Sequence, residues 1–179
     1  MGAVNKLLLD WQGEPLIRRS AARYCALGMS VNIVLGHEAD AVKAALDGLP
    51  VSTVLNEAHM TGQKSSVLAG LTAAKAEGDG VIMALGDQPL LQTDDISALC
   101  DAFLQSDKTR IVLPHFKGQR GNPVLLPALI ARRLKEEQTL PRAYMDQHPA
   151  KVHVFEAANP HFTTDLDTPE DLARLQSKF

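Results

Sequence analysis

Aromatic side chains and cysteines are scarce in this chain of 179 residues. Phe, Trp and Tyr together make up 4% of the sequence, which argues against the stacking platforms that bind single-stranded nucleic acid. Cys25 and Cys100 fall in helix-like segments and share no zinc-type spacing with the six histidines, so a structural zinc is not expected. We interpret both as reduced packing residues of a cytoplasmic protein.

Charge of one sign and long apolar runs are missing as well. The formal net charge is −3, and Lys and Arg are scattered, so no basic stripe invites duplex DNA or an anionic membrane. No apolar run reaches the length of a bilayer span, and no signal peptide is recognisable. We therefore expect a cytoplasmic protein with small-molecule substrates and with neither nucleic acid nor a membrane as a partner.

The sequence does contain 45% hydrophobic residues and a regular alternation of strand-like and helix-like segments. The strands are predicted at 31–36, 51–55, 81–85, 110–114, 122–126 and 151–155. Such alternation predicts an α/β protein with a mostly parallel sheet flanked by helices. Because no repeat, low-complexity segment or linker interrupts it, we expect one domain over residues 1–179.

Three helix starts are marked by polar residues. Thr93 is predicted to cap one helix, with acidic residues in its first turn. Thr168-Pro169-Glu170-Asp171 has the pattern of a capping box with proline at the first helical position. A further helix is predicted to run from Ser65 or Ser66 through Ala76.

The stretch Gly86-Asp87-Gln88-Pro89 follows a continuous apolar run that indicates a strand buried on both faces. Gly86 would let the backbone approach a ligand closely, and Pro89 ends the strand. Asp87 then lies at the carboxyl end of a central strand, where open α/β sheets bind their ligands. If Asp87 faces an anionic substrate, a metal ion is needed between the carboxylate and that substrate. From this segment alone, an aspartate that merely caps a helix or forms a turn is an equally good interpretation.

Two further carboxylates, Asp165 and Asp167, stand immediately before the last predicted helix. We expect only one of them to face the same ligand as Asp87. Carboxylates that converge from distant segments on Mg²⁺ would suit a nucleoside triphosphate. The alternative is a set of charges that cap the helix, which is the favoured role for Asp171.

Gly62-Gln63-Lys64-Ser65-Ser66 is superficially similar to a Walker A loop, but it contains no Gly-Lys pair and fails that motif. Ser65 and Ser66 would open a helix and direct hydroxyl and amide donors at a ligand, with ordinary capping as an equal alternative. Taken singly, Lys6 predicts a solvated surface lysine and Gly121-Asn122-Pro123 predicts a turn.

Taken together, these segments resemble the molybdenum cofactor nucleotidyltransferase family, and within it the cytidylyltransferase branch. Residues 1–9 match the second half of the family signature L-A-A-G-x-S-x-R-M-G-x-x-K-L-L-L. Gly86-Asp87-Gln88-Pro89 is typical of the cytidylyl branch, whereas the guanylyl branch usually carries C-D-x-P. Further similarity lies at 13–16, 34–39, 56, 62–66, 120–124 and 165–171.

The resemblance implies a Rossmann-like nucleotidyltransferase fold, similar to that of nucleotide-diphospho-sugar transferases. The implied reaction transfers CMP from CTP to the terminal phosphate of molybdopterin, the molybdenum cofactor, and releases pyrophosphate with Mg²⁺ or Mn²⁺ as the metal. The implied catalytic residues are Lys6 and Asp87, and the implied metal ligands are Asp87, Asp165 and Asp167. Nucleotide binding is implied for Lys6, Asn56, Ser65, Ser66, Gly86 and Asp87, and acceptor-side roles for Gln88, Pro89, Gly121, Asn122 and Pro123.

The resemblance also implies a chain that is truncated at its N-terminus, because the first strand and the glycine-rich loop of the family precede the matching segment. Three alternatives therefore stay open. One is a guanylyltransferase or another NTP transferase on the same fold, and another is a sugar-phosphate nucleotidyltransferase. The third is a non-catalytic module that binds nucleotide or cofactor for a partner enzyme. The partner expected for a cofactor transferase is a molybdoenzyme or its maturation chaperone.

Overall fold

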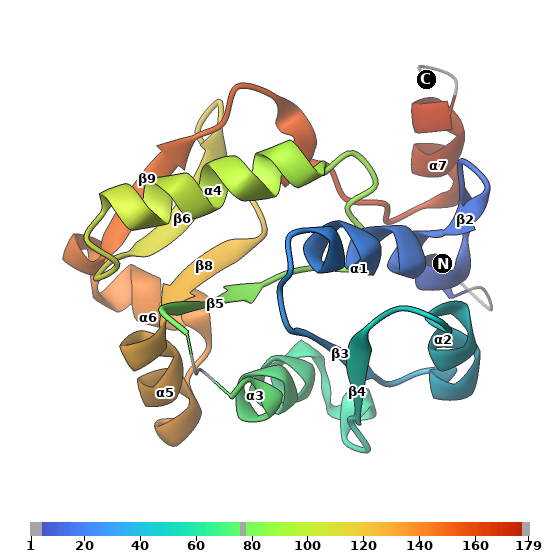
Figure 1. Ribbon diagram of the computed structural model, residues 1–179, viewed down its shortest axis with the longest axis horizontal. Coiled ribbons are helices and arrows are strands. Elements are labelled where there is room, and N and C mark those ends of the chain that lie inside the picture. Colours follow the sequence, from blue (N-terminus) through green and yellow to red (C-terminus); the bar gives the residue numbers. More distant parts are fainter. Residues whose placement is uncertain (1–4, 76–77, 177–179) are drawn as a thin grey trace.

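The computed structural model describes residues 5–75 and 78–176 (Figure 1). Its helices are α1 (Leu16–Ala26), α2 (Ala39–Ala45), α3 (Gln63–Ala73), α4 (Thr93–Gln105), α5 (Ala128–Glu136), α6 (Pro141–Gln147) and α7 (Pro169–Gln176). Its strands are β1 (Asp10–Trp11), β2 (Glu14–Pro15), β3 (Val31–Leu35), β4 (Val51–Leu55), β5 (Gly80–Met83), β6 (Ile111–Phe116), β7 (Gln119–Arg120), β8 (Val124–Pro127) and β9 (Val152–Glu156). Short 3₁₀ turns are η1 (Lys6–Leu8), η2 (His59–Thr61), η3 (Pro149–Lys151) and η4 (Pro160–Thr163).

The α/β class is confirmed, but the sheet structure is mixed where the sequence predicted it to be mostly parallel. β3 pairs with β4 in parallel, and β6 pairs with β9 in parallel. β8 lies antiparallel between β5 and β6. Only a short turn around β7 separates β6 from β8, and a connection that short returns the chain in the opposite direction.

Among the described residues, β3 and β5 belong to two separate hydrogen-bonded sets of strands. Within this part of the chain, β3 pairs with β4 alone and β5 pairs with β8 alone. Helix α3 spans both sets, because a Cβ atom on its Gly70 would lie 3.4 Å from Val34 of β3 and 4.0 Å from Met83 of β5. The glycine therefore permits the close packing that keeps the two sets in one fold.

Helices cover both faces of the larger sheet, with α1 and α4 on one face and α3 and α5 on the other (Figure 1). The strand residues alternate between these two cores, as the pleat requires. Ile111 and Leu113 of β6 pack with the α3–α5 cluster, whereas Val112 between them packs with the α4 cluster. Apolar side chains on both faces explain why the sequence of this strand is a continuous hydrophobic run.

The two ends of the described chain meet in a separate small core. Trp11, Leu16 and Leu90 pack there against Leu166 and Leu175, all of them buried. In Figure 1 helix α7 stands beside β2 for this reason. The packing brings the segment before α7 to the loop that follows β5, which are the two places where the sequence analysis predicted carboxylate ligands.

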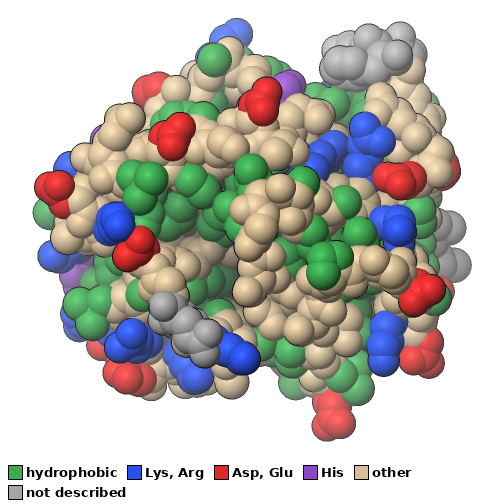
Figure 2. Space-filling model, in the orientation of Figure 1, with side chains coloured by type: hydrophobic (Ala, Val, Ile, Leu, Met, Phe, Trp, Pro, Cys, Tyr) green, Lys and Arg blue, Asp and Glu red, His purple; other side chains and the backbone are tan. Residues whose placement is uncertain are grey.

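Charges on the surface are mixed. On the face drawn in Figure 2, the described basic and acidic side chains are interspersed around the rim. Within residues 5–75 and 78–176, none of the helices has both the length and the apolar character that crossing a membrane requires.

Two predicted helix starts differ from the structure. The N-cap of α4 is Gln92 and not Thr93, because the Gln92 side chain and Asp95 form a reciprocal capping box and the Gln92 amide donates to Asp95 Oδ2 at 2.8 Å. Helix α3 begins at Gln63, so Ser65 and Ser66 lie inside its first turn. The capping box before α7 is confirmed, since Thr168 Oγ1 accepts from the Asp171 amide and Asp171 Oδ2 accepts from the Thr168 amide, both at 3.1 Å.

Replacing Thr168 with alanine should lower the free energy of unfolding by about 1 kcal/mol, because the helix loses its side-chain cap. Urea denaturation followed by circular dichroism measures the loss. Thr109→Ala is the matched control, since that exposed threonine lies in the turn between α4 and β6 and caps no helix. Equal stability of the two variants would contradict the assigned cap.

Candidate active site

Asp87 lies just beyond the carboxyl end of β5, as the sequence predicted, and its side chain is 13% exposed. Its carbonyl oxygen accepts a hydrogen bond from the Leu166 amide at 2.9 Å. This bond fixes the Asp165–Asp167 segment against the loop that carries Asp87. Gly86 serves packing here, because a Cβ atom would lie 2.8 Å from Ile17 and 3.0 Å from Leu7, so the protein itself and not a ligand occupies that space.

Lys6 joins two of the predicted carboxylates. Its Nζ atom lies 2.5 Å from Asp87 Oδ2 and 2.9 Å from Asp167 Oδ1. Burial disfavours the charged ammonium, but hydrogen bonds and the charges of the two carboxylates outweigh it, so the pKa of Lys6 is raised above 10.5. Lys6 is therefore not a freely solvated surface lysine, although its residue type alone predicted one.

The backbone before Lys6 is organised to present this side chain. Asn5 caps the 3₁₀ turn η1, since its Oδ1 accepts from the Leu7 amide at 3.1 Å. Its amide nitrogen donates to the carbonyl of His37 at 3.3 Å, which ties the turn to the segment after β3. Leu7 and Leu8 pack against the α1–α2 core, so the backbone at Lys6 is held on one side by apolar contacts.

Asp165 and Asp167 both belong to the cluster around Asp87, and the expectation that only one of them faces a shared ligand stays a prediction. Asp167 contacts Lys6, and the pKa of Asp165 is raised by burial, by the charge of Asp87 and by the charge of Asp167. The physical reason is that residues two apart on an extended chain project to the same side. Leu166, between them, is fully buried on the other side.

Gln88 and Pro89 are buried, which corrects their predicted place on the acceptor side. Gln88 is 1% exposed, and its Nε2 donates to the Phe162 carbonyl at 2.9 Å. The Asn122 amide donates to the same carbonyl at 2.8 Å, and the Asn122–Pro123 peptide bond is cis. A Cβ atom on Gly121 would lie 2.6 Å from that oxygen. The predicted acceptor-side residues therefore meet, but they meet on the backbone of η4 and hold it in place.

Helix α1 supports the loop that carries Asp87, through contacts that the sequence analysis did not predict. Arg23 is buried and donates to the Pro89 carbonyl at 3.0 Å, and Ser20 Oγ donates to the Leu85 carbonyl at 3.5 Å. Burial and the charge of Arg19 lower the pKa of Arg23 to about 10, so its guanidinium stays charged at neutral pH. The available signal in the sequence was the presence of two polar residues, Ser20 and Arg23, among the buried apolar positions of this helix.

A second set of contacts that the sequence analysis did not predict holds η4 to the start of α4. His161 Nδ1 lies 2.7 Å from Asp95 Oδ2, and Asn159 Nδ2 donates to Asp95 Oδ1 at 3.2 Å. Asp95 thus serves both the cap of α4 and the position of η4, which carries the Phe162 carbonyl. No motif in the sequence connected these residues, which come from segments more than sixty positions apart.

Asn56, Ser65 and Ser66 are brought together, as a shared nucleotide-binding role would require. Asn56 Nδ2 donates to Ser65 Oγ at 2.9 Å and to Ser66 Oγ at 3.0 Å. Asn56 is buried, and its backbone amide donates to the Leu35 carbonyl at the end of β3. These contacts place the N-terminus of α3 at the carboxyl end of β3 and β4, on the same edge of the strands as Lys6.

Residues 1–152 match the family model described as the MobA-like NTP transferase domain. The chain belongs to the MobA-like NTP transferase family. It is 31% identical to a molybdenum cofactor guanylyltransferase of Cereibacter sphaeroides over 99% of this chain and 89% of the relative. It is also 28% identical to a nicotine blue oxidoreductase of Paenarthrobacter nicotinovorans over 98% of this chain and 89% of that protein.

Solved structures confirm the nucleotidyltransferase fold. The nucleotidyl transferase Mth528 from Methanothermobacter superposes with a TM-score of 0.76 at 23% identity, covering 98% of this chain and 85% of that one. Rv0371c of Mycobacterium tuberculosis superposes with a TM-score of 0.76 at 19% identity, covering 98% and 90% of the two chains. A complex of Rv0371c with manganese superposes with a TM-score of 0.73 at 21% identity, covering 98% and 93%.

The carboxylates of this MobA-like protein have the donor chemistry for a divalent cation. Among the described residues, Asp87 Oδ1 and Asp165 Oδ1 are buried and lack a hydrogen-bond partner. In that part of the chain, no group of three or more His, Cys, Asp or Glu side chains is arranged so that it could hold a metal ion by itself. Mg²⁺ commonly binds through one or two carboxylates, with waters and substrate phosphates as the remaining ligands. The residues fit a metal that arrives with a nucleotide.

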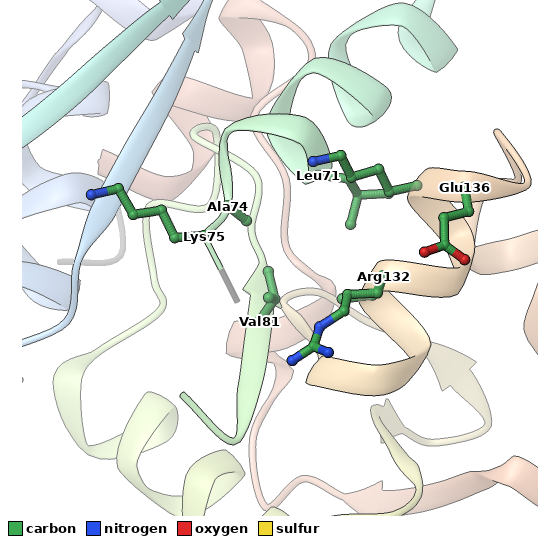
Figure 3. A pocket seen from close by; sticks show the side chains of 8 residues that line it. Leu71, Ala74, Lys75, Val81, Arg132 and Glu136 are labelled. Atoms are coloured by element: carbon green, nitrogen blue, oxygen red, sulfur yellow. The ribbon is translucent and has the colours of Figure 1, made fainter. Parts of the chain in front are cut away.

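A cavity of about 290 Å³ lies elsewhere and is not part of this site. Figure 3 shows its walls, which come from α3, from β5 and from α5 and include Leu71, Ala74, Val81, Arg132 and Glu136. Val81 lies near the amino end of β5, whereas Asp87 follows the carboxyl end of that strand. The polarity of the strand thus places the cavity and the carboxylate cluster at opposite ends.

Replacing Asp165 with asparagine should raise the melting temperature of the metal-free protein at neutral pH. The folded state holds the pKa of Asp165 above its ordinary 3.8, so ionisation costs stability as pH rises past that value. The gain should therefore be present at about pH 7 and absent at about pH 3, where both the folded and unfolded states are protonated. Differential scanning calorimetry in EDTA measures it.

Asp171→Asn is the matched control for this measurement. Hydrogen bonds from Thr168 lower the pKa of Asp171, so its removal should destabilise the protein at neutral pH. A loss of stability in Asp165→Asn at neutral pH would contradict the conclusion that ionised Asp165 destabilises the folded protein.

Proposed function

We propose that this protein transfers CMP from CTP to the terminal phosphate of the molybdenum cofactor and releases pyrophosphate. The observation that carries the proposal is the cluster in which Lys6 meets Asp87 and Asp167 at the carboxyl end of β5. Membership of the MobA-like family supports nucleotidyl transfer. The name of the relative from Cereibacter sphaeroides supports the cofactor as acceptor. The resemblance of Gly86-Asp87-Gln88-Pro89 to the cytidylyl branch supports CTP as donor.

The reaction is an in-line displacement at phosphorus. A phosphate oxygen of the cofactor forms a bond to the α-phosphorus of CTP, and the bond from that phosphorus to the bridging oxygen of the pyrophosphate breaks. Such a transfer depends on positioning and charge neutralisation more than on a covalent nucleophile. Lys6 supplies a positive charge that neutralises the triphosphate, since its raised pKa keeps the ammonium protonated at neutral pH.

Asp87 and Asp165 would hold Mg²⁺ or Mn²⁺ through the oxygens that lack partners, with Asp167 as a further ligand. When bound, the metal would withdraw electron density from the α-phosphate and orient it. The manganese complex of the structural neighbour Rv0371c supports a divalent metal on this fold. Asn56, Ser65 and Ser66 would place the N-terminus of α3 against the base or sugar of the nucleotide.

GTP is the second candidate donor. The specific observation in its favour is the name of the 31% identical relative, which is a guanylyltransferase. Both candidates use the same transfer chemistry, so the base is the property that distinguishes them. In either case we propose a molybdoenzyme or its maturation chaperone as the recipient of the product.

The deciding experiment offers CTP or GTP, each with Mg²⁺ and molybdopterin, to the purified protein. The readouts are pyrophosphate release and chromatography of the dinucleotide product, and omission of molybdopterin is the control. Product formation with CTP supports the proposal, and product with GTP alone replaces it with guanylyl transfer. Tight nucleotide binding without any product would indicate a non-catalytic module instead.

Asp87→Asn should lower nucleotidyl transfer by roughly 100-fold or more, because a charged ligand next to the reacting phosphates is lost. Its melting temperature should stay close to that of the unmodified protein. Asp79→Asn is the matched control, since Asp79 forms an exposed ion pair with Lys108 at the amino end of β5. Unchanged turnover in Asp87→Asn would remove Asp87 from the catalytic machinery.

A further inference from the structure

Lys6 occupies the space between two carboxylates that a divalent cation would need. Its ammonium forms ion pairs with Asp87 Oδ2 at 2.5 Å and with Asp167 Oδ1 at 2.9 Å. Charge-assisted pairs of this kind are stronger than neutral hydrogen bonds. A lysine ammonium is a compact point charge with three donors, so it is a reasonable substitute for a small cation. The geometry thus shows one cation already seated on two of the three proposed metal ligands.

The cluster nevertheless remains short of positive charge. Three carboxylates face one ammonium, and Asp87 Oδ1 and Asp165 Oδ1 have no partner among the described residues. Buried polar atoms in native proteins are almost always paired, and each exception calls for an explanation such as an ion. These two unpaired oxygens can accept a second cation, whereas Asp87 Oδ2 and Asp167 Oδ1 are already paired with Lys6.

We propose that Lys6 is the resident cation of the nucleotide-free site and competes with the divalent metal for Asp87 and Asp167. Two cations that share the same oxygens at about 3 Å repel each other, so the metal binds weakly until the lysine leaves. The phosphates of the nucleotide provide the alternative partner for the ammonium, and in that respect the inference rests on the proposed function. Metal and nucleotide then bind together rather than one before the other.

The structure lets the side chain move while its backbone stays in place. Lys6 Cα belongs to η1, which is fixed by the Asn5 cap and by the packing of Leu7. The Lys6 side chain is 34% exposed and has a flexible four-carbon stem. Rotation about its side-chain bonds can move the ammonium away from the carboxylates without displacement of the turn.

The test is titration of the nucleotide-free protein with Mn²⁺, followed by electron paramagnetic resonance of the free ion. Lys6→Met removes the charge and keeps an apolar stem of similar length. We expect its Kd for Mn²⁺ to fall by about tenfold or more, because the charge that competes for Asp87 and Asp167 is gone. Lys6→Arg should bind Mn²⁺ as weakly as the unmodified protein does.

Two further variants locate the effect. Lys108→Met removes another lysine from a Lys–Asp ion pair, at Asp79, and should leave Mn²⁺ binding unchanged. Adding Asp87→Asn to Lys6→Met should abolish the gain, since one of the released ligands is then lost. Mn²⁺ affinity in Lys6→Met that equals or falls below that of the unmodified protein would overturn the proposal.

Thermal unfolding gives a second readout that needs no activity. Lys6→Met in EDTA should melt below the unmodified protein, and Mn²⁺ should raise its melting temperature more than it raises that of the unmodified protein. If Lys6→Met does not fold, Lys6→Gln serves the same comparison. Because these measurements contain no nucleotide, tighter Mn²⁺ binding without any CMP or GMP transfer would uphold this inference and remove the proposed function. Transfer without tighter Mn²⁺ binding would do the reverse.

Discussion

The mutual repulsion of Asp87, Asp165 and Asp167 is the constraint around which the site of this protein is built. Burial and the neighbouring charges of Asp87 and Asp167 disfavour ionisation of Asp165, and its raised pKa expresses that cost. One ammonium, that of Lys6, offsets part of the repulsion. The hydrogen bond from the Leu166 amide to the Asp87 carbonyl then holds the Asp165–Asp167 segment next to Asp87 despite this repulsion. In the function proposed above, the negative charge that Lys6 leaves unmet would be available to a metal.

The framework that supports this cluster is made of buried polar contacts rather than of catalytic groups. Arg23 from α1 holds the Pro89 carbonyl, and Gln88 holds the Phe162 carbonyl. The Asp95–His161 contact in turn holds the turn that contains Phe162. Such supporting contacts fix the site because each polar group is committed to one partner in one geometry. The site is thereby preorganised on both sides of Asp87.

Several elements were predictable because short-range rules decide them. The strand at Val51–Leu55 has its predicted bounds, and the capping box at Thr168 is formed as its residue types require. The cap of α4 was misassigned because Thr93 is the commoner capping residue, whereas Gln92 forms the box with Asp95. The acceptor-side role of Gln88 was misread for a different reason. Its burial depends on η4, which lies more than seventy residues further along the chain.

The sequence by itself determined the α/β class, the place of Asp87 after an apolar strand and the family resemblance that singled out Lys6, because these rest on local pattern and residue order. Only the tertiary structure decided that Lys6 bridges Asp87 and Asp167, that Asp165 joins them, and that β8 makes the sheet mixed. The physical reason is that ion pairing and strand pairing depend on distances between segments far apart in the chain. Local propensity carries no information about those distances.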